Sequence, residues 1–254
     1  MSARPAPDAA SPGEGDRIPT IMARSEEVSE LAEFGIRAFA TTRSVGSFGL
    51  HTDEAVGAVF GRWNELRREL ARGASSGRLA TAGQVHGSTV VVHYRGWDGW
   101  LRVESADGHV STERGTGVAV TVADCVPVFI AHPSGAIALL HSGWRGTAVR
   151  IVERGIEALG QRGYPAAELR LHTGPAICGR CYEVSADTYA QLTGTTPGRP
   201  TPIDLRRLIA DHARAMGVRH ITSSPACTRC DNDRFFSHRA GDRGRMLGVM
   251  IADR

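Results

Sequence analysis

The segment of residues 118–147, VAVTVADCVPVFIAHPSGAIALLHSGWRGT, constrains the fold of this chain more than any other. It predicts two apolar strands joined by a short turn, followed by a glycine-flanked Trp-Arg pair that opens a helix. Asp124, Cys125 and His141 interrupt this apolar hairpin. An acid, a thiol and an imidazole are costly in a protein core unless they pair or bind a ligand. The hairpin therefore predicts a metal site or a catalytic pair.

The expected register of the hairpin brings Cys125 and His141 to one face. With a three-residue loop at 133–135, Cys125 lies opposite Gly143. The same register places His141 opposite Pro127. Both side chains then point the same way, because side chains alternate along a strand. A two-residue loop would place them on opposite faces, so the odd loop length is part of the hypothesis.

A third ligand is expected from His86, in the motif QVHG after a separate predicted strand. One cysteine and two histidines leave the fourth position of a zinc ion open, which is typical of catalytic zinc. The candidate metal ligands are thus His86, Cys125 and His141. The structural alternative is that the cysteine packs as a small apolar side chain and each histidine only satisfies hydrogen bonds.

Apolar periodicity predicts strands mixed with helices, without strict alternation. Besides the central hairpin, strands are expected at 35–42, 79–85, 89–93, 108–112, 169–173, 218–222 and 246–252. Helices are expected at 53–72, 147–160, 186–192 and 205–216, and residues 94–106 are expected to form a loop. A second hairpin is expected at residues 86–88. This pattern favours a mixed sheet with helices packed outside, the α+β (mixed α/β) class.

Residues 18–254 are expected to form a single domain, preceded by a disordered Pro-, Ala- and Gly-rich tail at 1–17. The net charge of +3 gives no indication of a nucleic acid or membrane partner. There is no signal-peptide pattern and no apolar run long enough for a membrane span. Together with an odd count of five cysteines, this predicts a cytoplasmic protein. Either a monomer or a small homo-oligomer is expected.

Several polar residues near the hairpin are candidates for chemistry. Arg145 lies in Gly143–Gly146 just before a predicted helix, where an anion would be stabilised. We take Cys125, Arg145 and Asp124 as candidate catalytic residues and Arg43 and Arg239 as candidate substrate-binding residues. All thirty basic residues of the chain are arginine, so solvated surface arginine and packing of Arg145 along Trp144 are the alternatives. Asp124 could instead orient a ligand or bond to backbone.

Two CxxC pairs, Cys178-Gly-Arg-Cys181 and Cys227-Thr-Arg-Cys230, are separated by residues 182–226. Paired CxxC motifs are typical of structural zinc sites, although the spacing here is longer than usual. Reduced thiols in the core are the favoured interpretation, and an exposed redox-active pair is a third one.

Five motifs together resemble the YfiH-like laccase-domain family, also labelled polyphenol oxidase or peptidoglycan editing factor. They are QVHG (84–87), VADCVPV (122–128), HSGWRG (141–146), GPAICGRCYEV (174–184), and CTRC followed by FFSHR (227–239). The resemblance implies zinc, or alternatively copper, held by His86, Cys125 and His141, and a layered sandwich of mixed sheets flanked by helices. It also implies phosphorolysis of adenosine, inosine and methylthioadenosine, and deamination of adenosine, so that a purine nucleoside and phosphate are the expected partners.

Three other functions compete with the purine nucleoside enzyme. A cysteine hydrolase would use Cys125 as nucleophile and His141 as base, and hydrolytic editing of peptidoglycan precursors is a related hypothesis. A copper oxidase is disfavoured because the ten histidines are scattered singly, with no His-x-His pair. A non-enzymatic, metal-stabilised binding module would need a closed four-ligand site, and the sequence offers no convincing fourth ligand.

Overall fold

The computed structural model describes residues 21–72 and 77–253, so the tail expected at 1–17 lies outside the described residues. The strands are β1 (Ser25–Glu27), β2 (Ile36–Thr41), β3 (Arg78–Ala82), β4 (Val90–His93), β5 (Trp100–Val103), β6 (Gly108–Ser111), β7 (Thr116–Val122), β8 (Val126–Ala131), β9 (Ile137–Ser142), β10 (Arg170–Thr173), β11 (Glu183–Val184), β12 (Thr201–Pro202), β13 (His220–Ser223) and β14 (Met246–Ala252). The α-helices are α1 (Val56–Ala71), α2 (Trp144–Ala148), α3 (Ile151–Gly160), α4 (Ala186–Thr193) and α5 (Leu205–Ala215).

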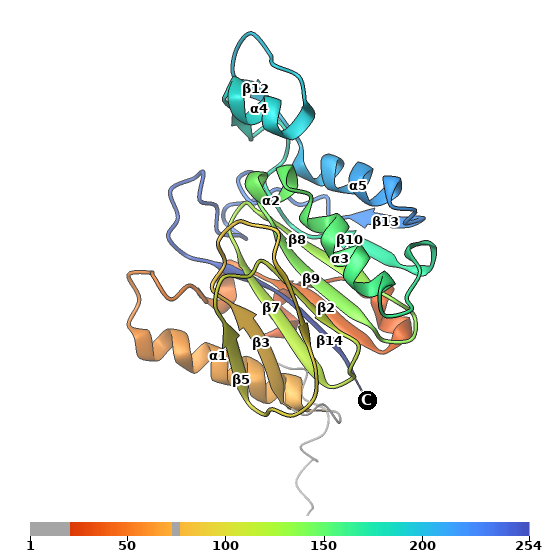
Figure 1. Ribbon diagram of the computed structural model, residues 1–254. Coiled ribbons are helices and arrows are strands. Elements are labelled where there is room, and N and C mark those ends of the chain that lie inside the picture. Colours follow the sequence, from red (N-terminus) through yellow and green to blue (C-terminus); the bar gives the residue numbers. More distant parts are fainter. Residues whose placement is uncertain (1–20, 73–76, 254) are drawn as a thin grey trace, which may run out of the picture.

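Two mixed six-stranded sheets pack face to face (Figure 1). Sheet A has the strand order β1-β2-β14-β7-β3-β5, and sheet B has the order β13-β10-β8-β9-β6-β4. Strands β11 and β12 form a separate two-stranded sheet. The arrangement confirms the predicted mixed α+β class with helices outside the sheets.

The central strands are apolar along their whole length because both of their faces are covered. In β7, Val118 and Val120 face sheet B, whereas Ala119 between them belongs to the cluster that faces helix α1. Strand β8 alternates in the same way, with Phe129 between the sheets and Val128 and Ile130 beneath the outer helices. This explains why the central segment shows no polar face in the sequence.

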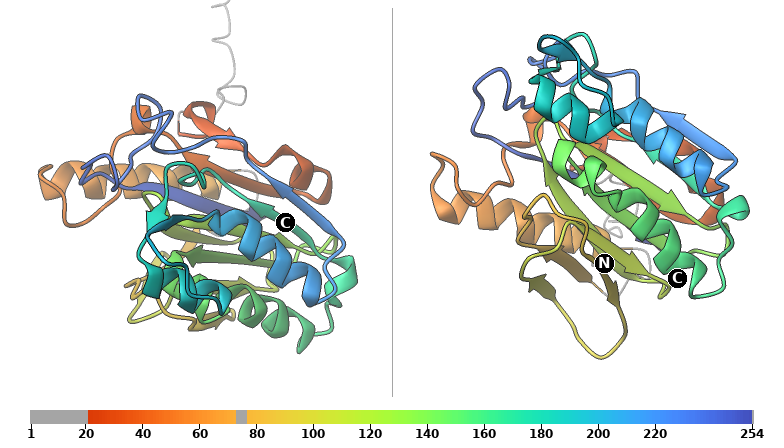
Figure 2. Two further views of the ribbon diagram at one scale, coloured as in Figure 1. Left: turned by 90° about the horizontal axis from the view of Figure 1, so that it is seen from above. Right: turned by 45° about the horizontal axis from the view of Figure 1, so that its top comes forward.

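Helices cover both outer faces of the sandwich (Figure 2). Helix α1 packs on sheet A through Val59, Trp63, Leu66 and Leu70, which recur at helical spacing. Helices α3 and α5 pack on the outer face of sheet B. The molecule thus has four layers, and its polar site must lie at an end of the sandwich or between elements rather than on the sheet faces.

At one end of the sandwich the chain crosses from sheet A to sheet B three times within the described ranges. The crossings are residues 83–89 from β3 to β4, 104–107 from β5 to β6, and 123–125 from β7 to β8. Because β3 runs parallel to both β5 and β7, their carboxyl ends lie at the same edge. The three connecting segments therefore meet there.

These crossings overturn two details of the sequence prediction. The apolar run around residue 124 is two strands in different sheets, separated where Asp124 adopts a left-handed φ of 78°. Likewise, β3 and β4 do not form the second hairpin expected at residues 86–88, because they belong to different sheets. Strand β5 also occupies part of the predicted loop at 94–106, and the helix expected at 147–160 is interrupted by a left-handed Arg150.

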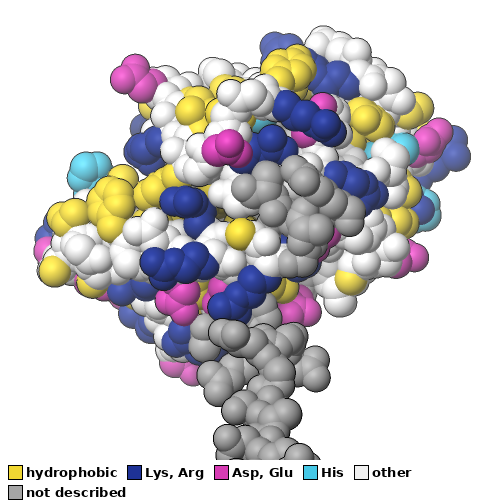
Figure 3. Space-filling view, turned by 90° about the horizontal axis from the view of Figure 1, so that it is seen from below, with side chains coloured by type: hydrophobic (Ala, Val, Ile, Leu, Met, Phe, Trp, Pro, Cys, Tyr) yellow, Lys and Arg dark blue, Asp and Glu magenta, His cyan; other side chains and the backbone are white. Residues whose placement is uncertain are grey.

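The face of the molecule seen from below is mixed in charge (Figure 3). On the face shown in Figure 3, arginine side chains are interspersed with carboxylates, and neither sign forms a continuous patch. None of the described helices combines the length and the apolar character that a membrane crossing requires.

Two buried histidines make the fold sensitive to acid. His93 Nε2 lies 2.9 Å from His109 Nδ1 in sheet B, and the two side chains are almost inaccessible to solvent. Burial lowers the pKa of His93 to about 4. Burial, together with the neighbouring His93, lowers the pKa of His109 to about 3. Both imidazoles must therefore stay neutral in the folded protein.

We predict that the protein loses stability as the pH falls below about 6.5, because the unfolded chain then binds protons that the folded chain excludes. At pH 5 the loss should reach about 2 kcal/mol per histidine relative to pH 7. Urea unfolding of the His93→Leu/His109→Leu protein at both pH values should show a flatter dependence. The exposed His220→Leu variant is the control, and an equal slope in all three proteins would contradict the prediction.

Candidate metal centre

The three predicted metal ligands converge at the end of the sandwich where the chain crosses between the sheets. His86 comes from the β3–β4 crossing, Cys125 from the β7–β8 crossing and His141 from the end of β9. One donor atom of each lies within 4.8 Å of the others. The two imidazole rings meet edge to face, with centroids 4.8 Å apart. This spacing allows the three donors to share one ion after small side-chain adjustments.

The hairpin register that the sequence predicted is confirmed. Pro127 pairs with His141, and the amide of His132 donates to the carbonyl of Ala136 around the three-residue loop. Gly135 in that loop has a φ of 101°, a backbone conformation that favours glycine. The register places Cys125 and His141 on the same side of the hairpin.

Gly143 keeps space open beside the donor atoms. A Cβ at this position would lie 2.8 Å from Cys125 Sγ and 3.3 Å from His86 Cδ2. Any other residue would push on two of the three candidate ligands at once. The donor set and this space fit a bound metal ion.

Asp107 holds the site together without being one of the three donors. It is fully buried and precedes β6. Its carboxylate accepts hydrogen bonds from the amides of Val85, His86 and Gly87 at 2.7–3.2 Å. Asp107 Oδ1 also lies 2.8 Å from His141 Nδ1, which leaves His141 Nε2 as the nitrogen directed to a metal. A carboxylate behind a ligating histidine fixes the orientation of the ring and strengthens the ligand.

The charges of the site favour a thiolate. Burial alone would raise the pKa of the Cys125 thiol, but the charge and hydrogen bond of His141, with those of His86, lower that pKa to about 6. Burial opposes protonation of His141, yet Cys125 and Asp107 raise the pKa of its imidazole to about 9. Without a metal, the two side chains form a thiolate–imidazolium pair at neutral pH. The thiolate is the form that binds metals or acts as a nucleophile.

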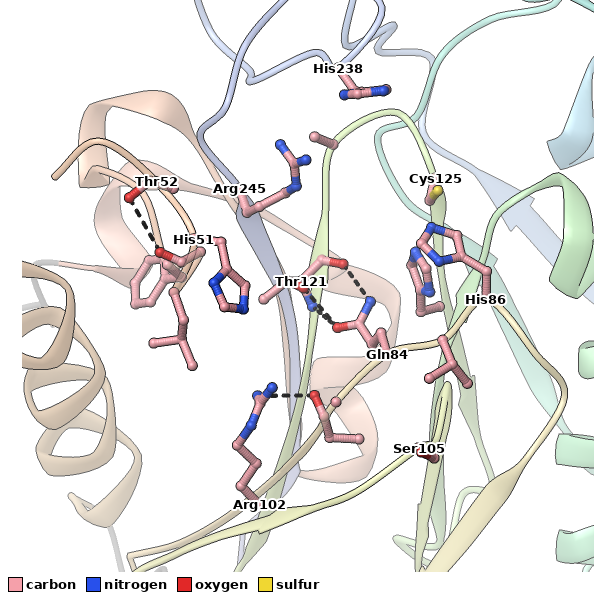
Figure 4. A pocket seen from close by; sticks show the side chains of 18 of the residues that line it. His51, Thr52, Gln84, His86, Arg102, Ser105, Thr121, Cys125, His238 and Arg245 are labelled. Carbon is pink, nitrogen blue, oxygen red and sulfur yellow. Dashed lines mark hydrogen bonds between the residues drawn. The ribbon is translucent and has the colours of Figure 1, made fainter. Parts of the chain in front are cut away.

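His86 and Cys125 lie at one side of a cavity of about 960 Å³ (Figure 4), which His141 also lines. The cavity extends from His86 and Cys125 past Gln84 and Thr121 to His51 and the loop around it, as Figure 4 shows. Arginines also line it, namely Arg102, Arg243 and Arg245. The site is therefore open to a small molecule and is not sealed by protein in the described structure.

Asp124 is engaged in structure-forming contacts. Its carboxylate accepts a hydrogen bond from Thr228 Oγ1 and another from the amide of Arg239, both at 2.6 Å. Its carbonyl accepts from the amide of Ile177 at 3.1 Å. Asp124 thus bonds to backbone, one of the alternatives raised for it, and these contacts fix the crossing that carries Cys125. Its catalytic role stays a prediction.

The predicted arginines occupy different surroundings. Arg145 is exposed at the start of α2, and its guanidinium stacks 4.3 Å from the centre of the Trp144 ring. Within the described residues the Arg145 side chain has no hydrogen-bond or ion-pair partner, although its backbone carbonyl accepts from the amide of Val149. Arg239 lies over the Tyr182 ring and donates to the carbonyl of Glu183. Burial and the nearby Cys125 raise the pKa of the Tyr182 hydroxyl to about 12, although the charges of Arg239 and Arg145 act to lower it.

The Arg43 side chain is held by an ion pair and by backbone carbonyls of the segment before β14. It pairs with Asp242 at 2.6 Å and donates to the carbonyls of Asn232 and Phe235. Neither Arg43, Arg145 nor Arg239 lines the cavity, so their substrate-binding and catalytic roles stay predictions. The cavity residues Arg102 and Arg243 had no distinguishing sequence signal, because arginine is frequent throughout the chain.

Comparison with known proteins identifies the family. A family model described as multi-copper polyphenol oxidoreductase laccase matches residues 40–253. The chain belongs to this laccase-like family. The resemblance to the YfiH-like laccase-domain proteins that the motifs carry is thereby confirmed.

Relatives in the laccase-like family carry a purine nucleoside phosphorylase name. A protein of that name from Streptomyces coelicolor is 36% identical over 197 residues, which cover 73% of this chain and 81% of the relative. A second, from Corynebacterium glutamicum, is 34% identical over 233 residues, covering 85% of this chain and 94% of the relative.

Solved structures show the same fold. Bacillus licheniformis YfiH superposes with a TM-score of 0.81 at 22% identity, covering 91% of this chain and 97% of that one. YlmD of Geobacillus stearothermophilus gives a TM-score of 0.79 at 28% identity, covering 87% and 94%.

We predict that Asp107→Asn weakens metal binding about 10- to 100-fold, as loss of a carboxylate behind a ligating histidine typically does. The amide can still accept from some backbone donors but no longer bears the charge that orients His141. Competition with a chromogenic chelator measures the affinity. An unchanged affinity in a folded variant would show that Asp107 does not support the ligand.

We also predict that Cys125 of the metal-stripped protein is alkylated by iodoacetamide with a midpoint near pH 6, because the lowered pKa keeps the thiolate present above that pH. Peptide mass spectrometry separates Cys125 from the other cysteines. His141→Gln should move the midpoint up toward the ordinary range of about 8.5. A midpoint in that range in the wild-type protein would refute the thiolate–imidazolium pair.

Proposed function

We propose that this protein is a zinc-dependent purine nucleoside phosphorylase. The observation that carries the proposal is the His86–Cys125–His141 donor cluster, which opens on one side into a cavity large enough for a nucleoside. The names of the relatives from Streptomyces coelicolor and Corynebacterium glutamicum support the reaction class. Adenosine, inosine and methylthioadenosine are the proposed substrates.

The donor set supports zinc in particular. One thiolate and two imidazoles suit a borderline-soft cation, with copper as the alternative metal. Three protein ligands leave a position free, as in catalytic rather than structural zinc sites. When bound, such an ion supplies a Lewis acid and an activated water, which would also account for deamination of adenosine. Asp107 keeps the His141 ring oriented for this role.

The cavity supports a nucleoside as the organic substrate. Its volume of about 960 Å³ lies in the range of small-molecule sites. Apolar walls from Phe48 and Leu50 and polar groups from Thr52, Gln84 and His238 line it. A planar base needs apolar surface and a ribose needs hydrogen-bonding groups, so both halves of a nucleoside have matching surroundings.

Arg145 is the proposed phosphate-binding residue. Its guanidinium has no hydrogen-bond partner within the described residues, whereas Arg245 donates to the carbonyls of Asp242, Arg243 and Gly244. A free guanidinium can bind two phosphate oxygens at once. In phosphorolysis a phosphate oxygen forms a bond to the anomeric carbon, the bond from that carbon to the base nitrogen breaks, and the purine leaves with the electron pair. Arg145 would hold the attacking phosphate and offset its charge, with Arg239 as companion.

The test is a turnover assay with adenosine, inosine and methylthioadenosine, with and without phosphate, followed by separation of free base from nucleoside. We expect phosphate-dependent release of the base that chelation abolishes and zinc restores. Arg145→Gln should raise the KM for phosphate about 10- to 100-fold, the loss expected for a charged hydrogen-bonding group. Arg219→Gln, the same change at an exposed site before β13, is the matched control.

Two results would refute the proposal. One is turnover that is independent of phosphate for every nucleoside. The other is full activity of the metal-free protein or of Cys125→Ala, because the cluster would then not be needed for the reaction.

A cysteine hydrolase is a second candidate, favoured by one observation. Asp107, His141 and Cys125 form a chain in which the carboxylate orients the imidazole and the imidazole lies beside the thiolate, the arrangement that activates a nucleophilic cysteine. Peptidoglycan precursors would be its substrate class. Metal distinguishes the candidates: stripping should activate a hydrolase, because it frees Cys125, and should inactivate the phosphorylase.

A further inference from the structure

A second cluster of sulfur atoms lies apart from the three-donor centre. Cys178, Cys181, Cys227 and Cys230 place their Sγ atoms within 4.8 Å of one another, and the Sγ atoms of Cys181 and Cys230 are 3.4 Å apart. All four are free thiols. They come from two loops, the one that follows β10 and the one that follows β13.

The fold itself brings these two loops together. Strands β10 and β13 are parallel neighbours in sheet B. Their pairing continues beyond the strands in a parallel bridge between Ala176 and Cys227, and the amide of Thr228 donates to the carbonyl of Ala176 at 3.2 Å. The two CxxC motifs are therefore in register at the end of the sheet, although residues 182–226 separate them in sequence.

Backbone amides near the sulfurs favour a thiolate at Cys227. Cys227 Sγ accepts from the amides of Cys178 at 3.3 Å and Cys230 at 3.4 Å. Such bonds stabilise negative charge on sulfur. Each motif also carries an arginine before its second cysteine, Arg180 and Arg229, and Arg229 reaches back to the carbonyl of Cys181. Two positive charges thus adjoin a group that would bear a net negative charge when metallated.

We propose that these four cysteines bind a second, structural zinc ion in a closed tetrathiolate site. A zinc–sulfur distance of about 2.3 Å in a tetrahedron requires sulfur–sulfur distances of about 3.8 Å. The four atoms, all within 4.8 Å of one another, need to move only slightly to meet this geometry. Four protein ligands leave no position for substrate, in contrast to the three-ligand centre at Cys125.

This zinc would stabilise the loops that lie beside the three-donor centre. Thr228, inside the second CxxC motif, donates to the Asp124 carboxylate at 2.6 Å. Ile177, next to the first motif, donates from its amide to the Asp124 carbonyl. Both loops therefore donate hydrogen bonds to Asp124, the residue that precedes Cys125. The ion would hold these loops in place and take no part in the reaction.

The test is the zinc content of the purified full-length chain, reconstituted with zinc under reducing conditions and freed of loosely bound metal. We expect two zinc ions per chain in the wild-type protein. His86→Ala/His141→Ala should retain one, and Cys178→Ser/Cys230→Ser should retain the other. Cobalt in the His86→Ala/His141→Ala protein should give the intense charge-transfer and tetrahedral absorption of a tetrathiolate, which does not depend on enzymatic activity.

One zinc per chain in the wild-type protein and none in His86→Ala/His141→Ala would overturn the proposal. So would an intact mass under the same conditions that shows the four cysteines oxidised to disulfides. The comparison of wild-type protein with the histidine variant decides the matter even if the cysteine variant does not fold. The result is also independent of phosphorolysis, because the second ion would be present whether or not nucleosides are substrates.

Discussion

The buried carboxylate of Asp107 is the interaction on which the rest of the site depends. It lies on one crossing between the sheets, accepts three backbone amides from a second crossing, and orients His141 on β9. The carbonyl of the same residue accepts the amide of His141 at 2.7 Å. An isolated buried carboxylate would be strongly destabilising. Here burial opposes its charge, but the hydrogen bonds from His141 and from the amides of Gly87 and His86 give Asp107 a lowered pKa.

Asp124 serves the remaining crossing in a similar way. It adopts a left-handed backbone conformation, and its carboxylate bonds to Thr228 and to the amide of Arg239. His86, on another crossing, is also left-handed, with a φ of 61°. Unfavourable backbone conformations of this kind persist where surrounding contacts determine them, and they cluster at functional sites. Two buried aspartates therefore fix the positions of the three donors.

The sequence allowed the local geometry of the site to be predicted but not the layering around it. Cys125 and His141 could be placed together because strand alternation and the length of one loop determine their relation. The change of sheet at Asp124 could not be seen, because an apolar run buried on both faces looks the same whether it continues or crosses over. The meeting of the two CxxC motifs depends on the pairing of β10 with β13, which no local pattern specifies.

The position of the three donors determines at which stage of folding a metal ion can bind. Cys125 and His141 belong to one hairpin and meet when β8 pairs with β9. His86 lies on the crossing from sheet A to sheet B, so the third donor joins them only when both halves of the sandwich have docked. Contacts this distant in sequence form late, after the entropic cost of closing long loops has been met. An ion that needs all three donors can therefore bind only when the fold is nearly complete. When bound, it would link the two halves of the sandwich.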